Sequence, residues 1–205
     1  MNISEWVRPN ILNLKPYSSA RDEFSGEAMV FLDANENPYN EPYNRYPDPL
    51  QRNLKQKIAG LKGVSPGQIF LGNGSDEPID LIIKLFCEPG VHNIVQFEPT
   101  YGMYQVAAAI NNVAVRKVML TEDFRLDADG MLKTVTPETR IIFLCSPNNP
   151  SGNALERESI EKVLTGFNGI VVLDEAYIDF ALNLSWLPRL KDYKNLIILQ
   201  TFSKA

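Results

Sequence analysis

The stretch that most constrains the fold of this chain is a short apolar run that ends in two acids, residues 170–175. It follows Asn168-Gly169, a loop-like pair, and has four aliphatic residues in a row with no polar residue between them. Such a run is typical of a central parallel strand that is buried on both faces of a sheet. Ligands of open α/β sheets bind beyond the carboxyl ends of the strands, so Asp174 and Tyr177 are expected beside a bound molecule.

Two further apolar runs are also followed directly by polar residues. Residues 141–145 lead into the sequence SPNNPSG at 146–152, and residues 196–199 are followed, after Gln200, by TFSKA at 201–205. We therefore expect three strands to bring polar loops to one edge of a sheet.

Helical and strand-like patterns alternate along much of the chain, which predicts an α/β fold with a mainly parallel sheet and helices on both faces. One helix is expected to begin with Asp48 as N-cap and Pro49 as its first residue, and to end at Gly60 to Gly63. Another begins near Ser75. The remaining expected elements are strands at 69–71, 94–97 and 113–120 and helices at 105–110, 129–135 and 155–167; the predicted buried stripe of the helix near Ser75 is Ile79, Ile82, Ile83 and Phe86.

The first 30 residues are too apolar for a free tail and too often broken by proline for a core helix, so an arm packed on another surface is expected. Residues 31–205 would then form one large domain. The chain stops directly after a strand and a lysine, where an α/β domain normally continues with a helix, and we therefore expect it to be truncated.

Composition excludes several classes of function. With 20 basic and 25 acidic residues the net charge is -5, which does not favour a nucleic-acid partner. The sequence has no signal-peptide pattern and no apolar run near the ~20 residues of a membrane span. Cys87 and Cys145 stand among apolar residues, as buried free thiols do, so a reducing, cytoplasmic location is expected.

No metal site is predicted. His92 is the only histidine, and the calcium-loop-like start at 127–130 is interpreted as a turn and helix cap.

Two motifs are ambiguous when each is taken alone. Residues 72–75, GNGS, could present backbone N–H groups to an anion, but the four residues taken alone favour a plain turn with Ser75 as N-cap. Lys204 could be an ordinary solvated lysine. A functional role for Lys204 is favoured by its neighbours Thr201 and Ser203, by Asp174, and by Asn149.

Together these residues resemble the active site of fold-type I pyridoxal-phosphate aminotransferases, in the order Asn-Pro-Ser/Thr-Gly, Asp-x-x-Tyr, Ser-Lys. Segments 32–39, 45–49, 72–77, 99–104 and 201–205 resemble the histidinol-phosphate aminotransferase family, of class II, in particular. The resemblance covers only the amino-terminal part of that family: an incomplete large domain, without the carboxy-terminal small domain.

The resemblance implies pyridoxal 5'-phosphate as cofactor and a role for each matching residue. Lys204 would hold the cofactor covalently and move a proton at the substrate. Asp174 would pair with the pyridine nitrogen. Tyr177 and Asn149 would hydrogen-bond the ring hydroxyl oxygen, and Tyr101 would lie against the ring face.

The cofactor phosphate would be bound by the backbone of Ser75 and Asp76 and by the hydroxyls of Thr201 and Ser203. Tyr46 of the partner subunit would reach the same phosphate, which implies a homodimer. Residues 33–38, with Asn35 and Glu36, would line the substrate side. The family's later arginines, which bind the cofactor phosphate and substrate anions, lie beyond residue 205.

The implied reaction transfers an amino group from L-histidinol phosphate to 2-oxoglutarate, in histidine biosynthesis. Two alternatives stay open: a lyase that resembles threonine-phosphate decarboxylase, and a non-catalytic fragment that binds no cofactor.

Overall fold

The computed structural model describes residues 2–18, 24, 30, 32, 34–39 and 43–204. The chain divides into two compact units, Met1–Leu12 with Gly72–Ala205, and Asn13–Leu71. Part of the predicted arm lies outside the described residues, and the division into an arm, 1–30, and a large domain, 31–205, stays a prediction.

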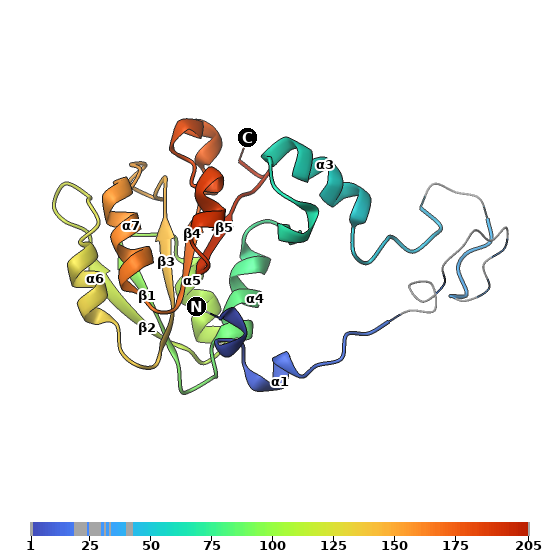
Figure 1. The fold of residues 1–205 in the computed structure, drawn as a ribbon, viewed down its shortest axis with the longest axis horizontal. Helices are drawn as coiled ribbons and strands as arrows, with labels where there is room; N and C mark the ends of the chain where they lie inside the picture. The colour runs from blue at the N-terminus through green and yellow to red at the C-terminus, as the bar shows by residue number, and fades with distance from the viewer. Residues whose placement is uncertain are drawn as a thin grey trace. The chain divides into compact units, whose positions relative to one another are not determined.

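A parallel sheet forms the centre of the first unit (Figure 1). Its strands are β1 (Asn93–Glu98), β2 (Ala114–Met119), β3 (Thr139–Cys145), β4 (Ile170–Asp174) and β5 (Leu196–Leu199), in the order β2-β1-β3-β4-β5. All residues of β4 are buried, as predicted for the central strand. Asp174 pairs in register with Cys145 of β3 and Leu199 of β5, so the three strands end at one edge.

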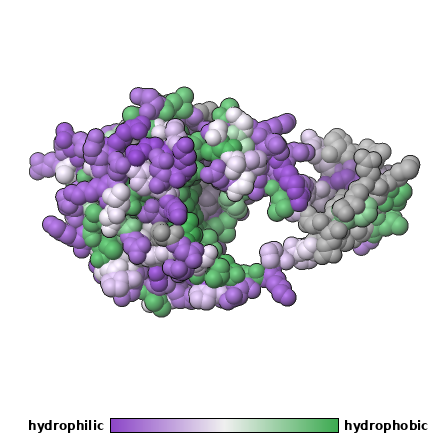
Figure 2. Space-filling view, in the orientation of Figure 1, coloured by the Kyte–Doolittle hydropathy of each residue, from purple (hydrophilic) through white to green (hydrophobic). Residues whose placement is uncertain are grey.

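Helices cover both faces of this sheet, as predicted, with α4 and α5 on one side and α6 and α7 on the other (Figure 1). Their bounds are Asp76–Phe86, Met103–Ile110, Ala128–Thr134 and Arg157–Gly166. The buried residues of α4 are those that the sequence predicts: Ile79, Ile82, Ile83 and Phe86. In the view of Figure 2 the surface over α7 is mainly hydrophilic, because the apolar side of that helix faces the core.

The segment between β4 and β5 consists of the short helices η3 (Ile178–Phe180), η4 (Leu182–Leu184) and η5 (Leu187–Asp192). The buried carboxylate of Glu175 holds this segment in place. It accepts hydrogen bonds from Ser185 Oγ at 2.8 Å, from Trp186 N at 2.6 Å and from Gln200 Nε2 at 2.8 Å. Glu175 therefore connects the ends of β4 and β5 to the segment that carries the buried Trp186.

The first residues of the chain pack on the same unit as the sheet. They form η1 (Ile3–Glu5) and α1 (Pro9–Leu12). The Arg8 amide donates to Leu85 O at 3.0 Å, and the Arg8 side chain pairs with Glu88 at 2.9 Å. The Arg140 guanidinium lies 4.8 Å from the centre of the Trp6 ring.

The second unit contains α3 (Arg52–Lys62) and η2 (Pro66–Gln68). The predicted start of α3 at Pro49 is wrong, because the Asp48 carboxylate accepts from the amides of both Leu50 and Arg52 and closes a turn there. Gln51 then takes a left-handed backbone, φ 53°, so the helix begins at Arg52. The predicted end is confirmed at Gly63, whose φ of 68° favours glycine.

The predicted strand at 69–71 is also wrong. Ile69 has an extended backbone, but residues 69–71 pair with no strand in the described part of the chain, and Phe70 is 60% exposed. A strand requires a hydrogen-bonding partner, which an apolar triplet does not guarantee.

Candidate active site

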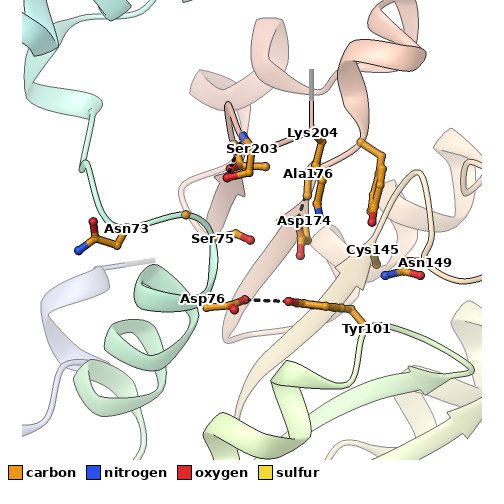
Figure 3. Close-up of a pocket in the computed structure, with 13 residues that line it drawn as sticks. Asn73, Ser75, Asp76, Tyr101, Cys145, Asn149, Asp174, Ala176, Ser203 and Lys204 are labelled. Atoms are coloured by element: carbon orange, nitrogen blue, oxygen red, sulfur yellow. Dashed lines mark hydrogen bonds between the residues drawn. The ribbon is translucent and has the colours of Figure 1, made fainter.

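A cavity of about 130 Å³ lies in the first unit, at the carboxyl edge of the sheet (Figure 3). Its lining comes from the start of α4 and from the ends of, or loops after, β1, β3, β4 and β5. All the site residues that the sequence predicts in this unit line it: Ser75, Asp76, Tyr101, Asn149, Asp174, Tyr177, Thr201, Ser203 and Lys204, joined by Asn73, Gly74, Cys145 and Ala176. The structure thus brings these residues together, while their individual roles stay predictions.

Asp174 is the most buried acid of the cavity, with 1% of its surface exposed. Its Oδ1 accepts from the Ala176 amide at 3.0 Å, and its Oδ2 accepts from the Tyr104 hydroxyl at 2.6 Å. Burial raises the pKa of Asp174, and the two hydrogen bonds oppose that rise. A cation or a proton donor in the cavity would therefore find an acceptor already fixed in position.

Tyr104 is a member of this group that the sequence reasoning missed. It is fully buried on α5, and its ring stacks on Phe143 with centroids 4.7 Å apart. A signal was present, since a tyrosine among the small apolar residues of a buried helix needs a hydrogen-bond partner for its hydroxyl.

Tyr101 forms one wall of the cavity, and its ring is seen edge-on in Figure 3. Its hydroxyl donates to Asp76 Oδ1 at 3.0 Å, which turns the Asp76 carboxylate toward Tyr101. Burial and then this hydrogen bond raise the pKa of Tyr101 to about 12. The phenol is therefore neutral at physiological pH, and its ring offers an apolar face.

The start of α4 can hold an anion. Gly74 has a φ of +66°, and a β-carbon placed on it would lie 4.0 Å from Ser203 Oγ, so this turn and the loop after β5 are neighbours. Ser75 is the N-cap residue, as predicted, but its side chain makes no capping hydrogen bond. Thr201 Oγ1 donates to Ser203 Oγ at 2.9 Å. Hydroxyls and helix N–H groups thus lie on one side of the cavity, as anion binding requires.

The two asparagines of the loop after β3 have different surroundings. Asn148 is buried and bound on every side, to Pro99 O at 3.1 Å, Ser151 Oγ at 2.6 Å and Thr100 Oγ1 at 3.0 Å. It fixes this loop to the loop after β1. Asn149, the predicted ligand, lines the cavity.

The Lys204 amine and the Cys145 thiol both line the cavity, and they differ in exposure. Lys204 is exposed, with Nζ 5.5 Å from the centre of the Tyr177 ring. In Figure 3 it projects into the same space as Asp174. Burial raises the pKa of the Cys145 thiol to about 12, so it is protonated and unreactive. Both cysteines are free and buried, as predicted.

The other predicted site residues, Tyr46, Asn35 and Glu36, belong to the second unit. There the Glu36 carboxylate accepts from the Tyr46 amide at 2.8 Å and pairs with Arg45 at 3.1 Å. Their role at the site stays a prediction.

Metal-binding side chains do not gather in threes anywhere in the described ranges. Asp127 caps α6 by accepting from the Gly130 amide at 2.9 Å, which confirms the interpretation of that segment as a turn and cap. No helix among the described residues is both long and apolar enough to cross a membrane.

The sequence profile "Aminotransferase class I and II" matches residues 28–205. A histidinol-phosphate aminotransferase of Parabacteroides distasonis is 62% identical over 204 residues, which cover 100% of this chain and 59% of that protein. The chain therefore spans about three fifths of the length of that relative.

Two solved structures share the fold at higher sequence divergence. The histidinol-phosphate aminotransferase of Sinorhizobium meliloti in complex with pyridoxal-5'-phosphate has a TM-score of 0.71 and 29% identity, covering 78% of this chain and 44% of that one. The L-threonine-O-3-phosphate decarboxylase of Porphyromonas gingivalis has a TM-score of 0.64 and 25% identity, covering 78% and 49%. On the profile match and these likenesses, the chain belongs to the class I and II aminotransferase family.

Proposed function

We propose that the protein is a pyridoxal-phosphate-dependent transaminase that converts L-histidinol phosphate and 2-oxoglutarate into imidazole-acetol phosphate and L-glutamate, a step of histidine biosynthesis. The observation that carries the proposal is the convergence of buried Asp174 and exposed Lys204, from neighbouring strand ends, on one cavity. The likeness to the histidinol-phosphate aminotransferase of Parabacteroides distasonis supports the choice of substrate.

The chemistry of the lining residues fits this cofactor. Asp174 is a fixed acceptor for the protonated ring nitrogen, Tyr101 supplies a flat wall for the ring, and the start of α4 supplies N–H groups for the phosphate. When bound, pyridoxal phosphate takes up the electron pair that is left on the substrate carbon when its proton departs.

The remaining steps fall to side chains of this chain. Lys204 binds the cofactor covalently and, as a free amine, carries the proton to and from the substrate carbon. Asp174 keeps the ring nitrogen protonated. Asn149 and Tyr177 hold the ring hydroxyl oxygen, while Thr201 and Ser203 help to bind the phosphate.

The working unit is proposed to be a cytoplasmic homodimer, with Tyr46 of the partner subunit at the cofactor phosphate and Asn35 and Glu36 on the substrate side. Large apolar side chains exposed in the second unit, such as Leu14 and Tyr43, support a partner surface. Mixing inactive Lys204→Ala chains with inactive Tyr46→Phe chains should restore part of the activity, because one site of each hybrid has both native residues. Hybrids without recovery would place Tyr46 beside the lysine of its own subunit.

A decarboxylase is the second candidate, favoured by the likeness to the Porphyromonas gingivalis structure. The two reactions differ in product: glutamate with 2-oxoglutarate for the transaminase, carbon dioxide for the decarboxylase. A fragment that binds no cofactor is the third.

An absorbance scan separates these possibilities. It is run on this chain and on the same chain continued by the remaining part of the Parabacteroides distasonis relative, with pyridoxal phosphate, before and after addition of L-histidinol phosphate. The products are then measured with L-histidinol phosphate plus 2-oxoglutarate and, separately, with L-threonine O-3-phosphate. A protein-bound cofactor band that shifts with the amine, and glutamate as product of the first mixture, are expected. A colourless protein in both forms would refute the proposal, and release of carbon dioxide from L-threonine O-3-phosphate without glutamate from the first mixture would replace it with the decarboxylase.

A further inference from the structure

A buried pair of acid and phenol, Asp174 and Tyr104, lies directly behind the cavity. The two residues are 70 positions apart in the sequence, on β4 and α5, and their oxygens are 2.6 Å apart. Asp174 is 1% exposed and Tyr104 is fully buried. A bond of this length to an ionised oxygen is a strong, charge-assisted hydrogen bond.

The contacts of Tyr104 fix its ring. The ring is stacked on Phe143 at an interplanar angle of 14° and meets Tyr101 edge to face at 5.7 Å. From this fixed ring the hydroxyl donates to Asp174, and the Cys145 thiol also lies beside it. With the Ala176 amide on Oδ1, both carboxylate oxygens are held, and the plane of the carboxylate is set before any ligand arrives.

Burial disfavours the ionised form of an isolated carboxylate at this depth. Burial raises the pKa of Asp174, and the hydrogen bond from Tyr104 is the first of the contacts that lower it. Burial and the charge of Asp174 in turn raise the pKa of Tyr104 well above its usual value, so the phenol keeps its proton and remains a donor. Other titratable or charged groups near this pair are Tyr101, Asp76, Cys145, Tyr177 and Lys204.

We propose that Tyr104 is a positioning residue of the site: through its hydroxyl it keeps Asp174 ionised and oriented toward the ring nitrogen of the cofactor. This inference rests on the proposed function for the identity of the ligand. Its first half, control of Asp174, concerns the protein alone and can be measured without cofactor.

The first experiment titrates Asp174 in the cofactor-free chain by ¹³C NMR, with its carboxyl signal identified through its loss in Asp174→Asn. Tyr104→Phe removes one oxygen and leaves the stacked ring. The pKa of Asp174 should rise by about one unit or more, the size of one lost hydrogen bond to a charged group. Tyr193→Phe is the matched control, because Tyr193 also donates to a carboxylate, that of Glu161, outside the cavity. It should leave Asp174 unchanged.

The second experiment compares two ligands in the continued chain used for the absorbance scan: pyridoxal phosphate and 1-deazapyridoxal phosphate, in which C–H replaces the ring nitrogen. Tyr104→Phe should weaken binding of pyridoxal phosphate about tenfold or more and leave the deaza analogue nearly unaffected. Equal losses for both ligands, or an unchanged pKa of Asp174, would show that Tyr104 only fills space and would overturn the inference.

A failure of the proposed function would give a different experimental result from a failure of this inference. If the native protein binds neither ligand, the cofactor proposal fails, while the NMR titration still decides whether Tyr104 controls Asp174. If Tyr104→Phe does not fold, 3-fluorotyrosine at position 104 keeps the shape and makes the hydroxyl a stronger donor. The pKa of Asp174 should then fall, and no change would again refute the inference.

Discussion

Replacing Glu175 with glutamine should destabilise the chain without touching the cavity. The glutamate carboxylate accepts three hydrogen bonds from Ser185, Trp186 and Gln200, and it is 1% exposed. In Glu175→Gln the remaining oxygen can keep the Trp186 amide, and the Ser185 hydroxyl can rotate to accept. The amide of Gln200, however, then faces another N–H₂ group, and turning it over to present its oxygen still replaces a charged hydrogen bond by a neutral one.

The expected loss of stability follows from the one charged hydrogen bond that is lost. A hydrogen bond to a charged group contributes about 1.5–3 kcal/mol, so the loss of one such bond lowers the free energy of unfolding by about 2 kcal/mol. In a chain of this size that corresponds to a fall in Tm of about 4–8 °C. Thermal unfolding followed by circular dichroism measures it directly.

Glu161→Gln is the matched control. Its carboxylate accepts from the Tyr193 hydroxyl and pairs with Arg189, but it lies at the surface, where water replaces lost partners. Its Tm should stay within error of the native value. A Glu175→Gln protein as stable as the native one would show that the negative charge of Glu175 does not strengthen these contacts, and the argument from three donors to one carboxylate would be refuted.

Two further predictions concern the cavity. Lys204→Ala should leave the Tm largely unchanged and abolish turnover in the continued chain, and borohydride should fix the cofactor to Lys204 of the native protein; labelling of another lysine would contradict this. Asp174→Asn should bind cofactor but lose turnover by on the order of 10² or more. Because burial raises the pKa of Asp174 above its unfolded value, the ionised carboxylate destabilises the cofactor-free fold at neutral pH. Asp174→Asn should therefore raise the Tm at pH 7, and this gain should vanish as the pH falls below ~3.9, where the carboxyl is protonated in both states. A lower Tm at pH 7, or near-normal turnover, would contradict the role given to Asp174.

The sequence predicts the first unit well because its signals are local. The uninterrupted apolar run of β4 and the 3.6-residue stripe of α4 each need only their own residues to be recognised. The predictions are wrong where the structure of a segment depends on residues elsewhere in the chain. Residues 69–71 have strand-like composition but pair with no strand among the described residues, and Asp48 could begin a helix or close a turn with equal local chemistry.

The same distinction applies to the candidate site. Motif order is enough to predict Asp174, Asn149 and Lys204 at one edge, and they do line one cavity. Tyr104 and Glu175 depend on contacts across the fold, with Asp174 and with the segment before β5, that spacing does not reveal. Successive residues at a strand end point in opposite directions, which explains why Asp174 lines the cavity while its neighbour Glu175 binds η5.

The sheet order also sets when the site can exist during synthesis. Strands β1 to β4 occupy adjacent positions and are complete once residue 174 has left the ribosome, so most of the core can form before β5 appears. The loop with Thr201, Ser203 and Lys204 joins only when β5 pairs with the exposed edge of β4. A nascent chain would therefore carry the acid of the cavity before its amine, and could not bind an aldehyde covalently at this site until the sheet is complete.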